Sequence, residues 1–319
     1  MPAAARRPGA NPPLGIGLIL LGAVFFACLD NTTRYLGATL PVLLILWSRY
    51  AFQAVVMAVW LLVTRRRPGG AGFAVSHRLF QAIRGALLLA TSAISFYGLQ
   101  FIPAAEFTAI SMLTPVIVTL LAAWLLHERV SRMRWAMVFG GFMGALIVMR
   151  PGSGVFGWTV LFPLASACTY ASFQVLTSKL AGVENPYTTH FYTGLVGVVL
   201  MTPVLWLSAV DVAGVLGAAS PAQVLQLLGI GLFGTTGHLL LILALGLAPA
   251  STLMPVFYSQ IAAAAAVGGR MFGDLPDRWA WLGMFVVGVC GAASAWLNMR
   301  EAAARNQPLP AATVDAMAD

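Results

Sequence analysis

Stretches of about twenty apolar residues follow one another almost without interruption along this 319-residue chain. Only 9% of the residues are charged and 60% are hydrophobic, which gives a mean hydropathy of +0.86. A soluble domain carries about 25% charged residues, so this chain has too little polar surface to cover a water-facing globule. Disorder is excluded because it requires low hydrophobicity. The composition therefore predicts an all-α integral membrane protein.

Charged residues, prolines and glycine-rich turns divide the chain into ten predicted membrane-spanning helices. Residues 212–269 contain no Asp, Glu, Lys or Arg, and the break between the eighth and ninth helices is placed at Pro249. The first apolar run lacks a small-residue cleavage site, so it is interpreted as an uncleaved helix. The ten helices are predicted at residues 14–36, 42–64, 79–99, 104–126, 134–149, 158–180, 186–207, 221–247, 250–272 and 278–299.

The distribution of lysine and arginine predicts the orientation of these helices. With a cytoplasmic N-terminus, twelve of the 18 cations fall on the cytoplasmic side and three on the other side. The remaining three, Arg34, Arg49 and Arg84, lie within predicted helices. We therefore expect a multi-pass inner-membrane protein with both termini in the cytoplasm. Residues 1–13 form a predicted cytoplasmic tail, and residues 301–319 a disordered cytoplasmic tail.

The two halves of the chain match each other at a constant offset of 146 residues. Pro103 corresponds to Pro249 and Glu128 to Asp274, and a later Arg-x-x-Trp step recurs at the same offset. Residues 14–152 and 153–300 are therefore predicted to be two repeats of five helices each. Because five is an odd number, the second repeat is expected to be inverted in the membrane. Inverted repeats are typical of secondary transporters, which bind their substrate near the midplane between the repeats.

Residues 101–115, 126–131 and 150–152 together resemble an EamA repeat of the drug/metabolite transporter superfamily. The resemblance implies ten helices arising from two such repeats. The second half departs from the pattern, with Asp274 where glutamate is usual and Ile261 where proline is usual. Arg49 and the pair Arg84-Gly85 resemble the branch that contains S-adenosylmethionine and riboflavin transporters. The resemblance implies alternating-access transport of a small polar metabolite, without a cofactor.

Charged side chains at membrane depth are costly and are therefore candidates for a functional site. Asp30, Asn31 and Arg34 lie in the first helix, and Asp30 and Arg34 share a helix face, where they could neutralise each other. Arg49 lies about 12 Å along its helix from Pro41. It is interpreted either as an anchor for a substrate carboxylate or as a structural partner of Asp30. Arg84 is expected to extend to the cytoplasmic interface.

Other polar and aromatic residues within the predicted helices are further candidates. Small hydroxyl residues also tie neighbouring helices together, and aromatic residues pack, so these alternatives stay open. Asp30, Glu106 and His190 are candidates for carrying a coupling proton, although Glu106 also fits a helix N-terminal cap. The remaining candidates for substrate contact are Tyr97, Ser111, Thr114, Tyr170, Gln174, His238, Tyr258 and Gln260.

Motifs for catalysis and for ATP binding are absent from the sequence. It contains no His-Glu-x-x-His, no Gly-x-Ser-x-Gly and no phosphate-binding Walker loop, so an enzyme is not expected. The expected partners are a small-molecule substrate, membrane lipid and a coupling proton, with no nucleic acid, metal or cofactor. The alternatives are an amino-acid or drug exporter of the same superfamily and a membrane scaffold that transports nothing.

The inverted repeat predicts that Ser131 and Asp277 lie on opposite membrane faces. In a background lacking Cys28, Cys168 and Cys290, single cysteines replace each residue in turn. An impermeant maleimide added to intact cells is expected to label position 277, and position 131 only after the membrane is opened. Labelling of both positions from one side would mean an even number of spans between them, and the two repeats would then be parallel.

Overall fold

Helices make up nearly all of the regular structure in the computed structural model, which describes residues 11–66, 72–98, 101, 107, 110–128, 130–149, 158–272 and 277–305. Within these ranges the only β pairing is an isolated bridge between Ala181 and Glu184. The helices of the first half are α1 (Pro12–Gly37), α2 (Val42–Thr64), α3 (Arg78–Gly98), α5 (Thr114–Leu125) and α6 (Arg132–Met149). Those of the second half are η1 (Trp158–Val160), α7 (Leu161–Leu180), α8 (Pro186–Leu207), α9 (Val212–Ala218), α10 (Pro221–Leu247), α11 (Ala250–Phe257), α12 (Ser259–Phe272) and α13 (Arg278–Arg305).

Six helical segments of the described chain are long and apolar enough to cross a membrane. They comprise α1, α2, α8 and α10, the continuous segment of η1 and α7, and the segment formed by α11 and α12. Two shorter apolar helices cover Thr114–Leu125 and Arg278–Ser294. Many large apolar side chains on the outside of the bundle are exposed, and Trp206 reaches 83%. An apolar exterior of this kind is suited to lipid rather than water.

Local sequence signals explain where several helices begin. The Asn11 side chain accepts a hydrogen bond from the backbone of Leu14, and Pro12 and Pro13 occupy the first turn of α1. Ser220 and Gln223 form a reciprocal capping box at the start of α10. Helix α10 ends at Leu247, and Pro249 precedes α11, so the predicted break at this proline is confirmed.

The structure also differs from the predicted helices in three places. The single helix predicted at residues 250–272 is interrupted at Tyr258, which separates α11, the helix that contains Pro255, from α12. A short helix, α9, was not predicted. Helix α13 continues to Arg305, so residues 301–305 are helical rather than disordered, while residues 306–319 lie outside the described ranges.

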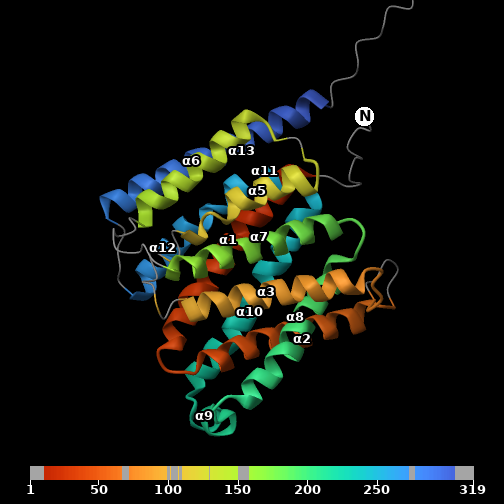
Figure 1. The fold of residues 1–319 in the computed structure, drawn as a ribbon, viewed down its shortest axis with the longest axis vertical. Helices are drawn as coiled ribbons and strands as arrows, with labels where there is room; N and C mark the ends of the chain where they lie inside the picture. Colours follow the sequence, from red (N-terminus) through yellow and green to blue (C-terminus); the bar gives the residue numbers. More distant parts are fainter. Residues whose placement is uncertain are drawn as a thin grey trace, which may run out of the picture.

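The most extensive helix contacts join the first half of the chain to the second. Helix α1 packs on α10, α2 on α8, α3 on α7 and α6 on α13. In Figure 1, α6 and α13 lie side by side along one edge, and α2 and α8 lie toward the opposite edge. By order along each half, α1 corresponds to α7, α2 to α8, α3 to α10 and α6 to α13. Exchanging these equivalent helices converts the α1–α10 pair into the α7–α3 pair, and it maps the α2–α8 and α6–α13 pairs onto themselves. The contact pattern therefore has the two-fold pseudosymmetry that two repeats would produce.

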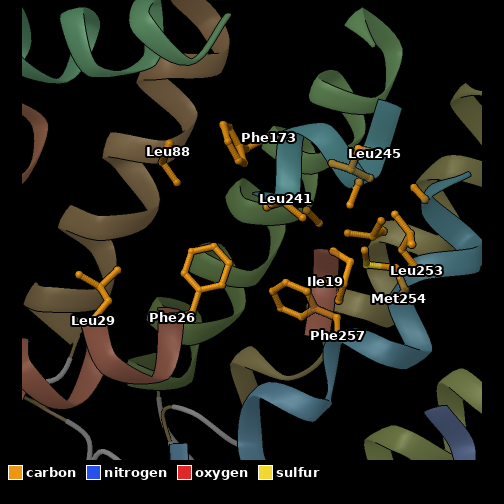
Figure 2. Close-up of a cluster of buried hydrophobic side chains, with 14 of the residues drawn as sticks. Ile19, Phe26, Leu29, Leu88, Phe173, Leu241, Leu245, Leu253, Met254 and Phe257 are labelled. Carbon is orange, nitrogen blue, oxygen red and sulfur yellow. The ribbon is translucent and has the colours of Figure 1, made fainter. Parts of the chain in front are cut away.

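The apolar core lies where α1, α3, α7, α10 and α11 meet. Figure 2 shows Phe26 and Ile19 of α1 beside Leu241 and Leu245 of α10 and Phe257 of α11. Helices approach most closely at glycines, which leave no side chain in the way. A Cβ added at Gly197 of α8 would lie 2.4 Å from the ring of Tyr50 on α2. This core holds the inner faces of both halves together around the polar groups described next.

Candidate functional site

Polar side chains from α2, α8 and α10 meet inside the bundle. Arg49 Nη2 lies 3.4 Å from His238 Nδ1, and Arg49 occupies the space beside Gly234, where an added Cβ would lie 2.8 Å from Nε. On the same α2 helix, Gln53 Nε2 donates to the backbone oxygen of His190 at 2.9 Å and lies 3.3 Å from its Nδ1. His190 Nε2 in turn lies 2.9 Å from the backbone oxygen of Thr235. The contacts of Arg49 and Gln53 cross between the two halves of the chain, whereas the contact between His190 and Thr235 lies within the second half.

Aromatic rings pack against the His238 ring. The ring of Phe26 stands edge-on at 4.8 Å, and that of Phe173 lies at 6.1 Å. Phe173 stacks on Tyr170 at 5.9 Å with an interplanar angle of 6°, and Tyr170 faces Phe257 at 6.3 Å. Four helices thus contribute one ring cluster beside the Arg49 guanidinium. Phe26, Phe173 and Phe257 are buried, and aromatic rings of this kind attract planar or cationic groups.

Asp30 lies at the edge of this group, on the exposed surface of α1. Its Oδ2 accepts a hydrogen bond of 3.1 Å from Gln260 Nε2 on α12, and its carboxylate interacts electrostatically with Arg49. Within the described ranges, Asp30 makes no direct ion pair with Arg49 or Arg34. Arg34 is itself exposed and has another interaction. Asp30 and Arg49 therefore interact electrostatically without a direct ion pair.

Several buried polar atoms in this region have no hydrogen-bond partner among the described residues. Whichever ring nitrogen of His238 carries the proton, Nε2 is left without a partner, and so are Arg49 Nε and the hydroxyl of Thr235. Both amide atoms of Gln174, a fully buried residue, are also unpartnered. An unsatisfied buried polar group costs about 1–3 kcal/mol, so this arrangement is suited to a polar ligand or to water that such a ligand displaces.

Arg84 does not extend to the interface, and that prediction is wrong. Its side chain is 0% exposed and donates to Thr177 Oγ1 at 3.2 Å, as well as to Thr193 Oγ1 and the backbone oxygen of Thr189. Its guanidinium also lies 5.2 Å from the centre of the Phe173 ring. The physical reason is local: threonines of α7 and α8 supply acceptors inside the bundle, so the guanidinium needs no path to water.

The other predicted residues fall into separate places. Tyr97 is 54% exposed and packs against Phe101 and Phe162, away from Arg49 and its neighbours. The Tyr258 hydroxyl donates to the backbone oxygen of Met112. The remaining four are Asn31, which ties α1 to Ala264 of α12, Thr114, which donates to the backbone oxygen of Ser111, Ser111 itself, whose hydroxyl has no partner among the described residues, and Glu106, which lies outside the described residues.

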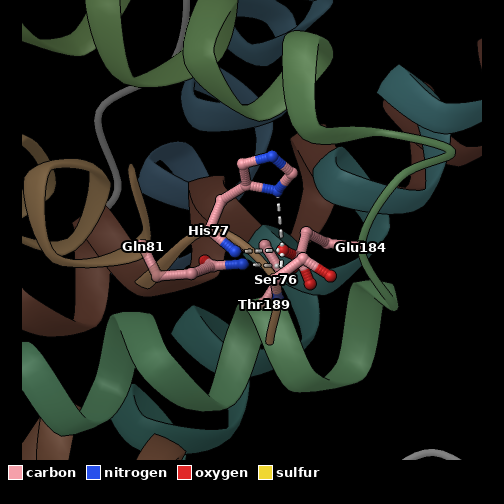
Figure 3. Close-up of polar contacts among 5 residues, drawn as sticks. All are labelled: Ser76, His77, Gln81, Glu184 and Thr189. Atoms are coloured by element: carbon pink, nitrogen blue, oxygen red, sulfur yellow. Dashed lines mark hydrogen bonds and ion pairs between the residues drawn. The ribbon is translucent and has the colours of Figure 1, made fainter. Parts of the chain in front are cut away.

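Two carboxylates that sequence analysis did not assign to the site join the halves of the chain. The Glu128 carboxylate, before α6, accepts from the backbone nitrogens of Ala250 and Ser251 at 3.2 and 3.1 Å and from the Ser251 hydroxyl at 2.7 Å. Glu184 Oε1, after α7, accepts from the backbone nitrogens of Ser76 and His77 at 2.9 and 2.8 Å (Figure 3). We call these two contacts the carboxylate clasps. The sequence signal that could have identified these two residues is a single acidic residue in a short loop between apolar helices.

The comparisons with known proteins agree with this architecture. Residues 13–150 and 157–296 each match the model of the EamA-like transporter family. This chain belongs to that family. The two matched segments correspond to the two halves whose helices pair across the bundle. A crystal structure of a protein that is 16% identical has the same fold, with a TM-score of 0.70 over 90% of this chain and 98% of that chain.

Three named relatives align with this chain, two of them over most of its length and one over a part of it. An S-adenosylmethionine uptake transporter of Rickettsia bellii is 24% identical over 83% of this chain and 87% of its own length. A riboflavin transporter of Rhizobium johnstonii is 30% identical over 60% of this chain and 61% of its own length. A pseudopaline exporter of Pseudomonas aeruginosa is 26% identical over 88% of this chain and 95% of its own length.

We predict that transport requires Asp30 and Arg49 individually, because they lie near each other without a direct ion pair. The variants Asp30→Asn and Arg49→Gln are each expected to fold and to lose at least tenfold in uptake of the compound that the wild-type chain carries, and the double variant is not expected to recover it. Folded yield by size-exclusion chromatography and uptake into cells measure both properties.

Asp211→Asn is the matched control, since it removes one carboxylate charge at the exposed cap of α9 and keeps a good capping residue. Single variants that lose folded yield, with recovery of yield and uptake in the double variant, would make Asp30 and Arg49 a structural pair.

Proposed function

We propose that this chain is a secondary transporter that moves a small polar metabolite across the inner membrane by alternating access. The observation that carries the proposal is the group of unpartnered polar atoms around Arg49 and His238, enclosed by aromatic rings and by helices of both halves. Membership of a transporter family supports transport over an enzymatic function. A site between two similar halves is what alternating access requires, because either half can then uncover it.

The chemistry of the site favours a substrate that carries both charges and a planar ring. The planar fork of Arg49 suits a carboxylate, and the exposed carboxylate of Asp30 suits a cationic group. The rings of Tyr170, Phe173 and Phe257 suit a flat heterocycle. S-adenosylmethionine has a carboxylate, a sulfonium cation and a purine, whereas riboflavin is uncharged. We therefore favour a substrate of the S-adenosylmethionine type over one of the riboflavin type.

We further propose ten membrane spans in two inverted repeats, with both termini in the cytoplasm. The symmetric pairing of helices between the halves supports the repeats, and the cation distribution supports the orientation. In this topology the α2–α3, α5–α6 and α7–α8 connections share the cytoplasmic side. Figure 1 agrees with such a grouping, since the ends of α2, α5 and α7 that lead into these connections lie on the right of the bundle.

The carboxylate clasps would then close the cytoplasmic side. Glu128 belongs to the first half and binds the start of α11, while Glu184 belongs to the second half and binds the segment before α3. Each clasp therefore has to break when the halves separate on that side. Charge-assisted hydrogen bonds to backbone N–H groups are among the stronger ones in proteins, and they are readily replaced by water once exposed. This supports a conformation open toward the outside, with Asp30 exposed.

An exporter is the second candidate, because one relative is named a pseudopaline exporter. The site itself does not distinguish directions, since alternating access runs either way according to the gradients. A scaffold that transports nothing would not require unpartnered polar atoms between its halves.

Counterflow in reconstituted vesicles tests the proposal. Vesicles preloaded with unlabelled S-adenosylmethionine are expected to accumulate labelled S-adenosylmethionine transiently, and more strongly than they accumulate riboflavin in the parallel experiment. Vesicles that contain Arg49→Gln protein serve as the matched control and should give little accumulation. If neither compound exchanges, while the wild-type protein is folded and inserted, these substrates are wrong; if no metabolite in a wider screen exchanges, the scaffold is favoured.

Breaking a clasp is predicted to expose the site to the cytoplasm. Glu128→Ala and Glu184→Ala are each expected to raise, at least fivefold, the rate at which an impermeant maleimide labels a cysteine at Thr235 in inside-out vesicles. Thr235 is buried and lies at the His190 contact, so its accessibility reports on the opening of the bundle.

The control for this experiment is Asp211→Asn, which removes a carboxylate at α9, in a loop assigned to the opposite face. Labelling rates that stay unchanged in both clasp variants would show that the carboxylates do not hold the cytoplasmic side closed.

A further inference from the structure

The Arg84 guanidinium lacks a negative partner in the described part of the chain. All its hydrogen-bond acceptors are neutral oxygens of Thr177, Thr189 and Thr193, and its Nε has no partner. The side chain is fully buried. Placing a charge away from water without an opposite charge costs several kcal/mol. A helix tie alone would be served more cheaply by a neutral amide, such as that of the neighbouring Gln81, which already donates to Thr189 Oγ1 at 3.0 Å.

A cavity of about 380 Å³ lies beside this arginine, between α1, α7, α8 and α10. Thr177 and Thr189 line it, so two direct partners of Arg84 separate the guanidinium from the cavity. Much of the remaining lining is apolar, and the Glu184 clasp contributes a carboxylate. Figure 3 shows Gln81 and Thr189 next to Glu184, which places the arginine's surroundings and the clasp in one region. The apolar part of the lining includes Leu14, Leu18, Leu180, Ile242 and Leu243.

We infer that Arg84, together with Thr177 and Thr189, forms a second anion-binding position for the transported metabolite, on the cytoplasmic side of Arg49. The inference rests on the proposed function in one respect, that the ligand is the transported compound. Its chemical class is a small zwitterion: the carboxylate or phosphate lies toward Arg84, the cationic group toward Glu184, and the uncharged part against the apolar lining.

The path between the two arginines supports this assignment. Helix α8 carries His190, which contacts Gln53 one turn from Arg49, and Thr189 and Thr193, which contact Arg84. Polar groups of one helix therefore link the surroundings of Arg49 to those of Arg84. Successive sites of this kind keep a charged ligand from meeting an apolar barrier, and each binds weakly enough to release it.

The test uses the chemistry of a reporter cysteine and needs no transported compound. In purified full-length protein lacking Cys28, Cys168 and Cys290, Ala181→Cys places a thiol in the cavity lining, at the C-cap of α7, where the backbone nitrogen of residue 181 donates to the backbone oxygen of Thr177. Labelling rates are compared for an anionic sulfonatoethyl and a cationic trimethylammonioethyl methanethiosulfonate. Arg84→Gln is expected to lower the anionic-to-cationic rate ratio at least threefold, whereas Arg84→Lys is expected to keep it. Inorganic phosphate at constant ionic strength should slow labelling only in chains with a cation at position 84.

Thr177→Val and Thr193→Val form a matched pair that stays informative if Arg84→Gln fails to fold. Each removes one hydroxyl that accepts from Arg84, but only Thr177 lines the cavity. Protection by phosphate is expected to weaken at least threefold in Thr177→Val and to persist in Thr193→Val. Equal effects of the two valines, or a rate ratio unchanged in Arg84→Gln, would reduce Arg84 to a helix tie and overturn the inference.

Counterflow separates this inference from the proposed function. If S-adenosylmethionine exchanges but the anionic-to-cationic labelling ratio does not depend on Arg84, only the second anion-binding position is wrong. If no compound exchanges while the ratio and phosphate protection depend on Arg84, the anion position stands and the proposed transport function fails.

Discussion

A guanidinium group inside an apolar helix bundle requires hydrogen-bond acceptors around it. This structure holds two such guanidinium groups, those of Arg49 and Arg84, and its polar interior is arranged around them. Arg49 lies against Gly234 and His238, and Arg84 lies among three threonines of α7 and α8. Neither is neutralised by a carboxylate in direct contact within the described residues. Because unpaired buried charge is costly, both arginines are candidates for binding an anionic group of a ligand.

The halves of the chain are held together by different kinds of contact at different depths. Apolar side chains of α1, α10 and α11 form the centre of the core, and ring clusters and buried polar groups adjoin it. The carboxylate clasps add hydrogen bonds between the halves outside this apolar centre. Polar ties at the end of the bundle are suited to opening and closing, since their hydrogen bonds can be exchanged for hydrogen bonds with water.

Much of the fold could be predicted from apolar run lengths, because a bilayer imposes a nearly constant helix length. The ends of α2 at Val42 and Thr64 and the break at Pro249 agree with those predictions. The split at Tyr258 and the short helix α9 could not be predicted from hydropathy, because hydropathy reports only how apolar a segment is and not which backbone hydrogen bonds form within it. Of the candidate site, Arg49, His238 and Tyr170 come together as one group, whereas Tyr97 lies elsewhere.

By itself the sequence determined that this chain belongs in a membrane, that it is built from apolar helices, and that its halves are related. These properties follow from composition, segment length and a constant offset, which need no knowledge of neighbours in space. Only the tertiary structure decided that Arg84 is buried rather than extended to the interface, and that Glu128 and Glu184 join opposite halves. The physical reason is that the environment of a charge depends on which acceptors distant helices bring to it, and the order of residues along one helix does not encode that.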